Sequence, residues 1–176
     1  MQITEHKKLD AFCRLIDAIN ERTGRIVAWL FIPFTLLVAA DVFTRYVLRN
    51  PWFYIDVNIQ IMGTLIMLGG GYCLLHQSHI GVDTLVSRLS PRKRAIIDLI
   101  LFPIFVGSIG ALLWKTGIAA WDAWVWKERY SFSALLPIIY PYKTIIVLGI
   151  LLVLLQGTVK FIRDLLFVIH PGPESK

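Results

Sequence analysis

Four long runs of apolar residues alternate with short polar segments along the chain. The runs cover about residues 26–48, 53–75, 95–121 and 141–165. An α-helix needs about 20 mainly apolar residues to cross the hydrocarbon core of a bilayer, and each run is long enough or nearly so. The pattern therefore predicts an all-α integral membrane protein with four transmembrane helices, which form a single membrane domain over residues 1–176.

The segment before the first run, about residues 8–22, has a different pattern. Apolar residues recur there at helical spacing, while charged residues occupy the other faces; the apolar positions are Leu9, Phe12, Cys13, Ile16 and Ile19. A helix of this kind can lie flat on the inner leaflet with its apolar face in the lipid. We expect an N-terminal amphipathic interfacial helix, and the alternative is a short helix packed against the bundle.

The composition supports a membrane protein. Hydrophobic residues make up 56% of the chain and charged residues 17%, and the mean hydropathy is +0.64. A soluble domain of this size carries more charge and shorter apolar runs. The net charge of +6 comes from basic clusters beside the apolar runs, where lysine and arginine meet lipid headgroups, so it does not indicate a nucleic-acid partner.

The distribution of basic residues predicts the orientation. With four spans, twelve of the eighteen lysines and arginines fall on the side that holds both termini. Loops rich in lysine and arginine stay in the cytoplasm, so we expect both termini to be cytoplasmic. Aromatic residues gather at the opposite ends of the spans, as an interfacial belt does; they are Trp52, Tyr54, Trp121, Trp124, Trp126, Tyr140 and Tyr142.

Ionisable residues inside the spans can mark function, because a charge in hydrocarbon is costly. Asp41 and Arg45 are four residues apart, the spacing at which helical side chains meet, and we expect them to pair with each other. Asp56 and Asp98 are each expected in the first turn of a helix, where the helix dipole favours a carboxylate. Neither Asp56 nor Asp98 requires an ion pathway.

Small residues in the second and third runs predict places where helix backbones approach closely. They are Gly63 and Gly69 to Gly71 in the second run, and Gly107, Gly110, Ala111 and Gly117 in the third. The contacts can be within the chain or with another subunit, and the sequence leaves both open. Pro33 and Pro103 lie inside the first and third runs, where proline kinks a helix or frees a carbonyl group.

Several membrane enzymes are disfavoured. A dihaem cytochrome needs histidines within facing helices, but the four histidines, His6, His76, His79 and His170, fall at or beyond the span ends. Cys13 and Cys73 do not form the reactive pair that disulfide exchange requires. His76, His79 and Asp83 have helical spacing that suits a metal, but a hydrogen bond between His79 and Asp83 explains these residues more simply. We predict no catalytic, metal or cofactor site.

Two motifs carry a resemblance to a known family. The end of the first span and the loop after it read Arg45-Tyr46-Val47-Leu48-Arg49-Asn50-Pro51-Trp52, and the second span is followed by His79-Ile80-Gly81-Val82-Asp83. This order resembles the small membrane subunit of tripartite ATP-independent periplasmic (TRAP) transporters, over nearly the whole chain. One departure is Asp56, a single acid where many members carry paired glutamates.

The resemblance implies a secondary transport system of the bacterial inner membrane. In it, a periplasmic solute-binding protein delivers an organic acid or related solute to a large, elevator-type membrane subunit, which is expected to hold the coupling ion, Na⁺. The small subunit is then a stationary scaffold without a cofactor. Candidate structural or partner-contact residues are Asp41, Arg45, Asn50, Pro51, Trp52, Asp56, His79, Asp83, Gly107 and Gly110.

The main alternative is a self-contained small carrier that uses Asp41 as a proton-coupling acid. Such carriers are often built from inverted repeats, and no repeat is evident between the two halves of this chain. A membrane enzyme is a third possibility.

Overall fold

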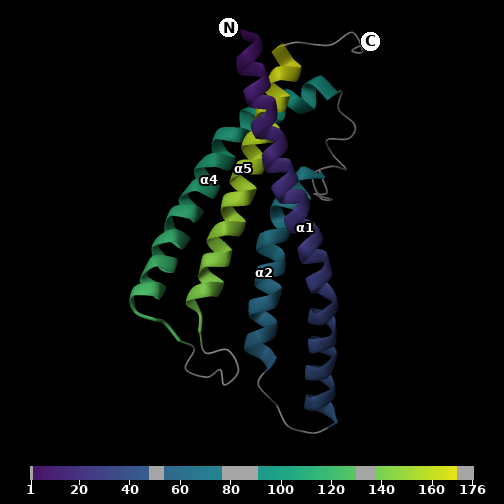
Figure 1. Cartoon of the computed structure of the whole chain (residues 1–176), viewed down its shortest axis with the longest axis vertical. Helices are drawn as coiled ribbons and strands as arrows, with labels where there is room; N and C mark the ends of the chain where they lie inside the picture. Colours follow the sequence, from purple (N-terminus) through teal and green to yellow (C-terminus); the bar gives the residue numbers. More distant parts are fainter. Residues whose placement is uncertain (1, 48–53, 77–90, 130–137, 170–176) are drawn as a thin grey trace.

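The computed structural model describes residues 2–47, 54–76, 91–129 and 138–169. In these ranges the chain forms four helices (Figure 1): α1 (Gln2–Tyr46), α2 (Tyr54–Leu75), α4 (Pro91–Val125) and α5 (Tyr140–Ile169). Each of the four is long and apolar enough to cross a membrane. The prediction of an all-helical chain with four apolar helices is confirmed.

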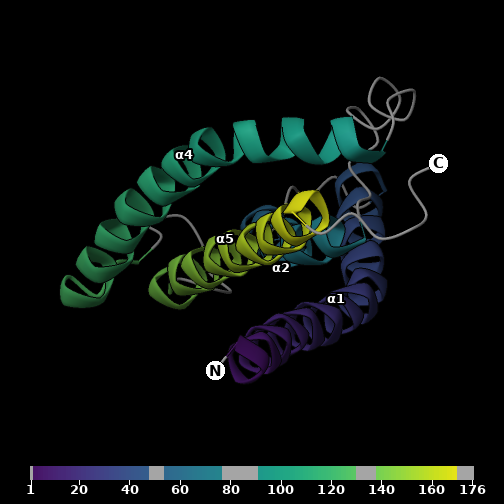
Figure 2. The ribbon, with the colours of Figure 1, turned by 90° about the horizontal axis from the view of Figure 1, so that it is seen from above.

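The helices stand side by side in the order α4, α5, α2, α1, and they spread apart away from the end where α1 begins and α5 ends (Figure 1). The main contacts join α4 to α5, α5 to α2, and α2 to α1, and α5 also touches α1. Seen from above, the helices form a curved row rather than a closed ring (Figure 2). The last helix of the chain is therefore central and holds the row together.

A separate interfacial helix at the N-terminus was predicted, and this detail is wrong. α1 runs without interruption for 45 residues through the junction between the amphipathic segment and the first span. Gly24 lies at that junction and is the residue that most suggests a helix end. Its missing side chain instead makes room for the ring of Tyr72 on α2, since a Cβ atom there would collide with that ring. The glycine thus allows α1 and α2 to pack closely, and the helix continues through it.

The third span also starts earlier than predicted. α4 begins at Pro91, so Asp98 lies about two turns inside the helix and not in its first turn. The first part of α4 runs across the other helices before the rest turns to follow α5 (Figure 2). Pro103 lies inside α4, and a proline, which lacks the backbone N–H, is a common cause of such a bend.

The best-buried contacts gather between α1 and α5. Val159 on α5 has no exposed surface, and it packs with Cys13 and Ile16 on α1, with Leu155 and Ile162 at the edge of this cluster. The apolar stripe of residues 9–19 therefore has a protein partner along part of its length. The alternative reading of the N-terminal segment, a helix packed on the bundle, describes Cys13 and Ile16 better.

Candidate functional site

A chain of hydrogen bonds joins α1 to α5 towards the end of the row where α1 begins. The side-chain amide of Asn20 donates to Oε1 of Gln156 over 2.7 Å, and the amide of Gln156 donates to Oδ1 of Asp17 over 2.9 Å. Arg163 completes the chain by pairing with the other oxygen of Asp17. Asn20 is fully buried and Gln156 is 2% exposed, so the bond between their amides is out of contact with solvent, whereas the pair of Asp17 and Arg163 is partly exposed. We call these four residues the polar junction.

The polar junction also fixes the position of α2. Oδ1 of Asn20 lies against the backbone of Gly71, where a Cβ atom would collide with it. This oxygen has no hydrogen-bond partner among the described residues. A second link between α1 and α2 lies nearby, where Nε2 of His76 is 2.9 Å from Oε2 of Glu21. Three helices therefore meet around one buried amide.

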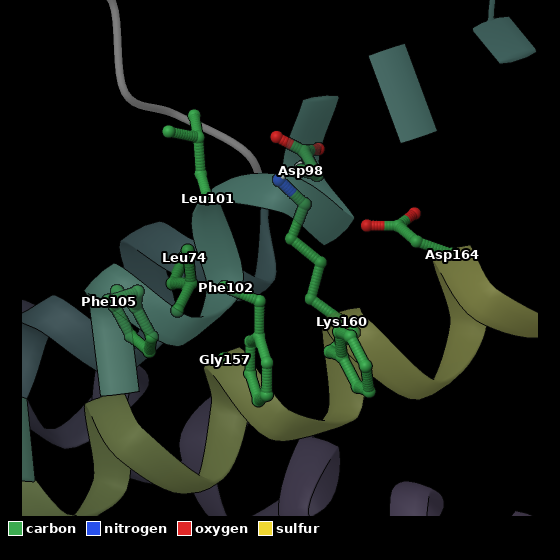
Figure 3. Close-up of a pocket in the computed structure, with 9 residues that line it drawn as sticks. Leu74, Asp98, Leu101, Phe102, Phe105, Gly157, Lys160 and Asp164 are labelled. Atoms are coloured by element: carbon green, nitrogen blue, oxygen red, sulfur yellow. Dashed lines mark ion pairs between the residues drawn. The ribbon is translucent and has the colours of Figure 1, made fainter. Parts of the chain in front are cut away.

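A hollow lies between α4 and α5, close to the same end of the row (Figure 3). Nζ of Lys160 is 2.8 Å from Oδ2 of Asp98 across its mouth. Phe102 and Phe161 stack with their ring centroids 3.9 Å apart, and the ring of Phe105 lies over Gly157. The hollow thus has charged groups at one edge and aromatic rings along its wall.

At the far end of the row, Asp41 and Arg45 form the ion pair expected from their spacing. Nη2 of Arg45 is 2.8 Å from Oδ2 of Asp41, and Asp41 is 8% exposed. The pairing prediction is confirmed.

The end of α4 and the beginning of α5 are joined at the same end of the row. Lys143 pairs with Glu128, and the indole N–H of Trp124 donates to the hydroxyl of Thr144 over 2.9 Å. The ring of Trp124 also lies 4.3 Å from that of Tyr140, centroid to centroid.

The glycines divide into two groups. Those in α2 and α5 lie where a neighbouring helix comes close: a Cβ atom on Gly149 would be 2.6 Å from the carbonyl oxygen of Met67, and one on Gly70 would be 3.0 Å from Val153. The glycines of α4 differ, because no atom of the described chain lies within 4 Å of a Cβ placed on Gly107, Gly110 or Gly117. Close packing within the chain is therefore found for the second span and not for the third.

Several predicted residues cannot be compared with the structure. Asn50, Pro51, Trp52, His79 and Asp83 lie outside the described residues, and Asp56 lies in α2 with its side chain outside that description. Within the described ranges, no three histidine, cysteine, aspartate or glutamate side chains are grouped to hold a metal ion.

The polar junction was not predicted from the sequence, although two signals pointed to it. Gln156 is the only side-chain amide between Tyr140 and Ile169, in a segment that is otherwise mostly apolar. Asn20 continues the stripe that holds Cys13 and Ile16, four residues beyond Ile16. A polar residue on a buried stripe calls for a polar partner.

One of three comparisons with known proteins identifies a family. No match was found among curated proteins or among solved structures. A sequence profile of a family described as "Tripartite ATP-independent periplasmic transporters, DctQ component" matches residues 34–167, about three quarters of the chain. The protein therefore belongs to the DctQ component of the TRAP transporters, the small membrane subunit, and is a multi-pass transporter subunit and not an enzyme.

Proposed function

We propose that this subunit is a stationary brace for the large membrane subunit and does not itself bind the transported solute. The observation that carries the proposal is the open row of helices in Figures 1 and 2. A translocation path needs helices on all sides of a solute, whereas a row presents two broad faces. The polar junction holds three helices at one end, and the ion pair of Lys143 and Glu128 ties α4 to α5 at the other.

Membership of the family implies partnership with the other components of a tripartite system. We infer that these are a large elevator-type subunit, which carries the solute and its coupling ion, Na⁺, and a periplasmic binding protein that delivers an organic acid or related solute. We place the chain in the bacterial inner membrane with both termini in the cytoplasm. The beginning of α1 and the end of α5 lie at the same end of the row, as this orientation requires (Figure 1).

The rival function, a small carrier that uses Asp41, has less support. Asp41 is held by Arg45 on the same helix and lies near the end of α1, away from the polar junction. A coupling acid must exchange its proton with the transport path, whereas the carboxylate of Asp41 contacts the guanidinium of Arg45 on its own helix. We assign this pair a structural role at the outer end of α1.

A transport assay separates the two functions. The purified chain, reconstituted alone in proteoliposomes, is expected to take up no organic acid under a sodium or proton gradient, because it offers no enclosed path. Liposomes that also contain the large subunit and the binding protein serve as the positive control. Uptake by the chain alone that disappears in Asp41→Asn would establish the carrier instead.

We propose that the outward face of α4 contacts the large subunit. Gly107 and Gly110 leave open surface there, and small residues let a foreign helix come close enough for van der Waals contact, which drives helix association in lipid.

Substitution of these two glycines tests the contact. Gly107→Leu and Gly110→Leu are expected to reduce copurification of the large subunit about tenfold or more, because a bulky side chain separates the backbones. The thermal unfolding of the isolated chain should not change, since neither glycine has a neighbour within 4 Å. Ile104→Leu is the matched control, because Ile104 is already a large, 66% exposed residue of α4. Full copurification of both glycine variants would mean that another helix contacts the large subunit.

A further inference from the structure

Lys115 is a charged residue inside the membrane-spanning part of α4. The helix ends at Val125, and the stretch between the two residues is about 15 Å long. Trp121, a 71% exposed aromatic residue typical of the membrane interface, lies about 9 Å beyond Lys115. The hydrocarbon core is about 30 Å thick, so Lys115 lies well below its nearer surface. A lysine at this depth needs an explanation, because an unpaired charge in hydrocarbon is costly.

The described part of the chain offers Lys115 no partner. Its side chain is exposed, and no ion pair or hydrogen bond joins it to another residue within the described ranges. By contrast, Lys143 pairs with Glu128. Asp122 shares the face of Lys115 on α4 but lies two turns further on, about 10.5 Å along the axis, which is too far for a direct ion pair. The acid that Lys115 requires must therefore come from outside the described chain.

A lysine can also reduce the cost by extending its side chain to the nearer surface of the membrane. The nearer surface for Lys115 is at the C-terminal end of α4. In an α-helix, however, the bond from Cα to Cβ tilts towards the N-terminus. The side chain of Lys115 thus leaves the backbone in the opposite direction, and bending back shortens its reach. This position favours an acidic partner at the same depth.

The place of α4 in the row identifies the kind of partner. α4 stands at one end of the row and packs mainly on α5, so its exposed side faces lipid or another membrane protein (Figures 1 and 2). A water-soluble binding protein does not reach into the hydrocarbon. A second copy of this chain, related by a two-fold axis along the membrane normal, would bring its own Lys115 to the same depth, and like charges repel. A different membrane subunit with a carboxylate at this depth fits the lysine.

We propose that Lys115 forms an ion pair inside the membrane with an aspartate or glutamate on a helix of the large subunit. The pair depends on the contact of α4 with the large subunit proposed above, and it adds the chemistry of that contact. Ala111 and Ala119, both exposed, lie one turn before and one turn after Lys115. These small residues let the partner helix come close enough for a direct pair. A lysine that is unpaired alone and paired in the complex also selects this partner over other membrane proteins.

Copurification of the large subunit with the Lys115→Met chain tests the ion pair. Methionine is a long side chain of similar helix propensity but carries no charge. The recovery of the large subunit is expected to fall about tenfold or more, because its carboxylate is left unpaired in hydrocarbon. Lys115→Asp should recover still less, since it sets two like charges against each other. Lys93→Met is the matched control, because Lys93 is an exposed lysine in the first turn of the same helix, where water and headgroups solvate a charge.

Thermal unfolding of the isolated chain separates pairing from folding. The unfolding temperature of Lys115→Met should not fall, because Lys115 makes no polar contact within the described ranges. A lower unfolding temperature would show that Lys115 supports the fold of its own chain, and it would overturn the proposal. Full recovery of the large subunit with Lys115→Met would also overturn the ion pair, while the contact at Gly107 and Gly110 would stand. Failure of the wild-type chain to copurify would overturn the brace and the pair together.

A cross-link and an exchange of charges identify the acid. A photoreactive amino acid in place of Ile118, which is 47% exposed and about one turn from Lys115, is expected to label a helix of the large subunit within one turn of an aspartate or glutamate. Lys115→Asp combined with a lysine in place of that acid should restore most of the copurification. Labelling of a second copy of this chain, labelling of a helix with no acid within one turn, or no recovery after the exchange would each contradict the proposal.

Discussion

A leucine in place of Gly149 is expected to destabilise the purified chain by about 3 kcal/mol or more, the upper part of the range for overpacked cores. At ~2–4 °C per kcal/mol, the unfolding temperature should fall by about 6–12 °C. The cause is the close approach of α5 to α2, where a Cβ on Gly149 would lie 2.6 Å from the carbonyl oxygen and 2.7 Å from the carbonyl carbon of Met67. Backbone atoms cannot rotate away, so the two helices must separate. Thermal unfolding in detergent, followed by circular dichroism, measures the effect.

Gly117→Leu is the matched control for this prediction. It adds the same side chain to a helical glycine, with the same change in helix propensity, but no described atom lies within 4 Å of its Cβ. Its unfolding temperature should stay close to that of the wild type. Equal unfolding temperatures for the two variants would show that α2 and α5 do not meet closely at Gly149.

The four spans could be predicted because the features that define them are local. Length and hydrophobicity are properties of each segment alone, and the bilayer sets a fixed requirement for both. The same holds for the pair of Asp41 and Arg45, which are one helical turn apart, so that helix geometry alone brings them within reach.

The helix ends were harder to predict, because neighbouring helices decide them. The amphipathic segment was expected to end near residue 22, before the first apolar run begins at residue 26, yet α1 continues through both. Gly24, between them, lies against Tyr72 of α2, which occupies the space that a side chain would need. Asp98 was expected in a first turn, but α4 extends further towards the N-terminus and Asp98 pairs with Lys160 of α5. Both outcomes depend on residues far away in the sequence.

The partners of the glycines could not be predicted either. The sequence marked Gly70, Gly71, Gly107 and Gly110 alike as small residues in apolar helices. Only the order of the helices in the row separates them, because it places Gly70 and Gly71 against neighbours and leaves the other two on an open face. No periodicity in a single sequence gives the order in which the helices pack. The sequence therefore does not distinguish glycines that contact another helix from glycines on an open face.

The polar junction could not be predicted for the same reason, because its residues are far apart in the sequence. Its disruption is expected to cause the second large loss of stability. Asn20 and Gln156 are 136 residues apart in the sequence and 2.7 Å apart in the structure. Replacing Gln156 with leucine removes the acceptor for the amide of Asn20 and a donor to Asp17. A buried polar group that loses its partner costs ~1–3 kcal/mol. Asn20 is fully buried, whereas Asp17 is partly exposed and keeps Arg163, so the free energy of unfolding should fall by about 1–3 kcal/mol.

A double-mutant cycle tests whether this cost comes from the lost pairing. Asn20→Leu combined with Gln156→Leu should be more stable than the sum of the single variants predicts, because replacing both partners leaves fewer unpaired groups between α1 and α5. Thr158→Val is the control on the same helix, since the hydroxyl of Thr158 donates to the carbonyl of Leu154 one turn earlier and not to another helix among the described residues. Thermal unfolding of the four proteins gives the coupling energy. Strictly additive effects would mean that the two amides do not act on each other. The link between the first and last helices would then rest on the ion pair of Asp17 with Arg163 and on the contacts of Val159 with Cys13 and Ile16.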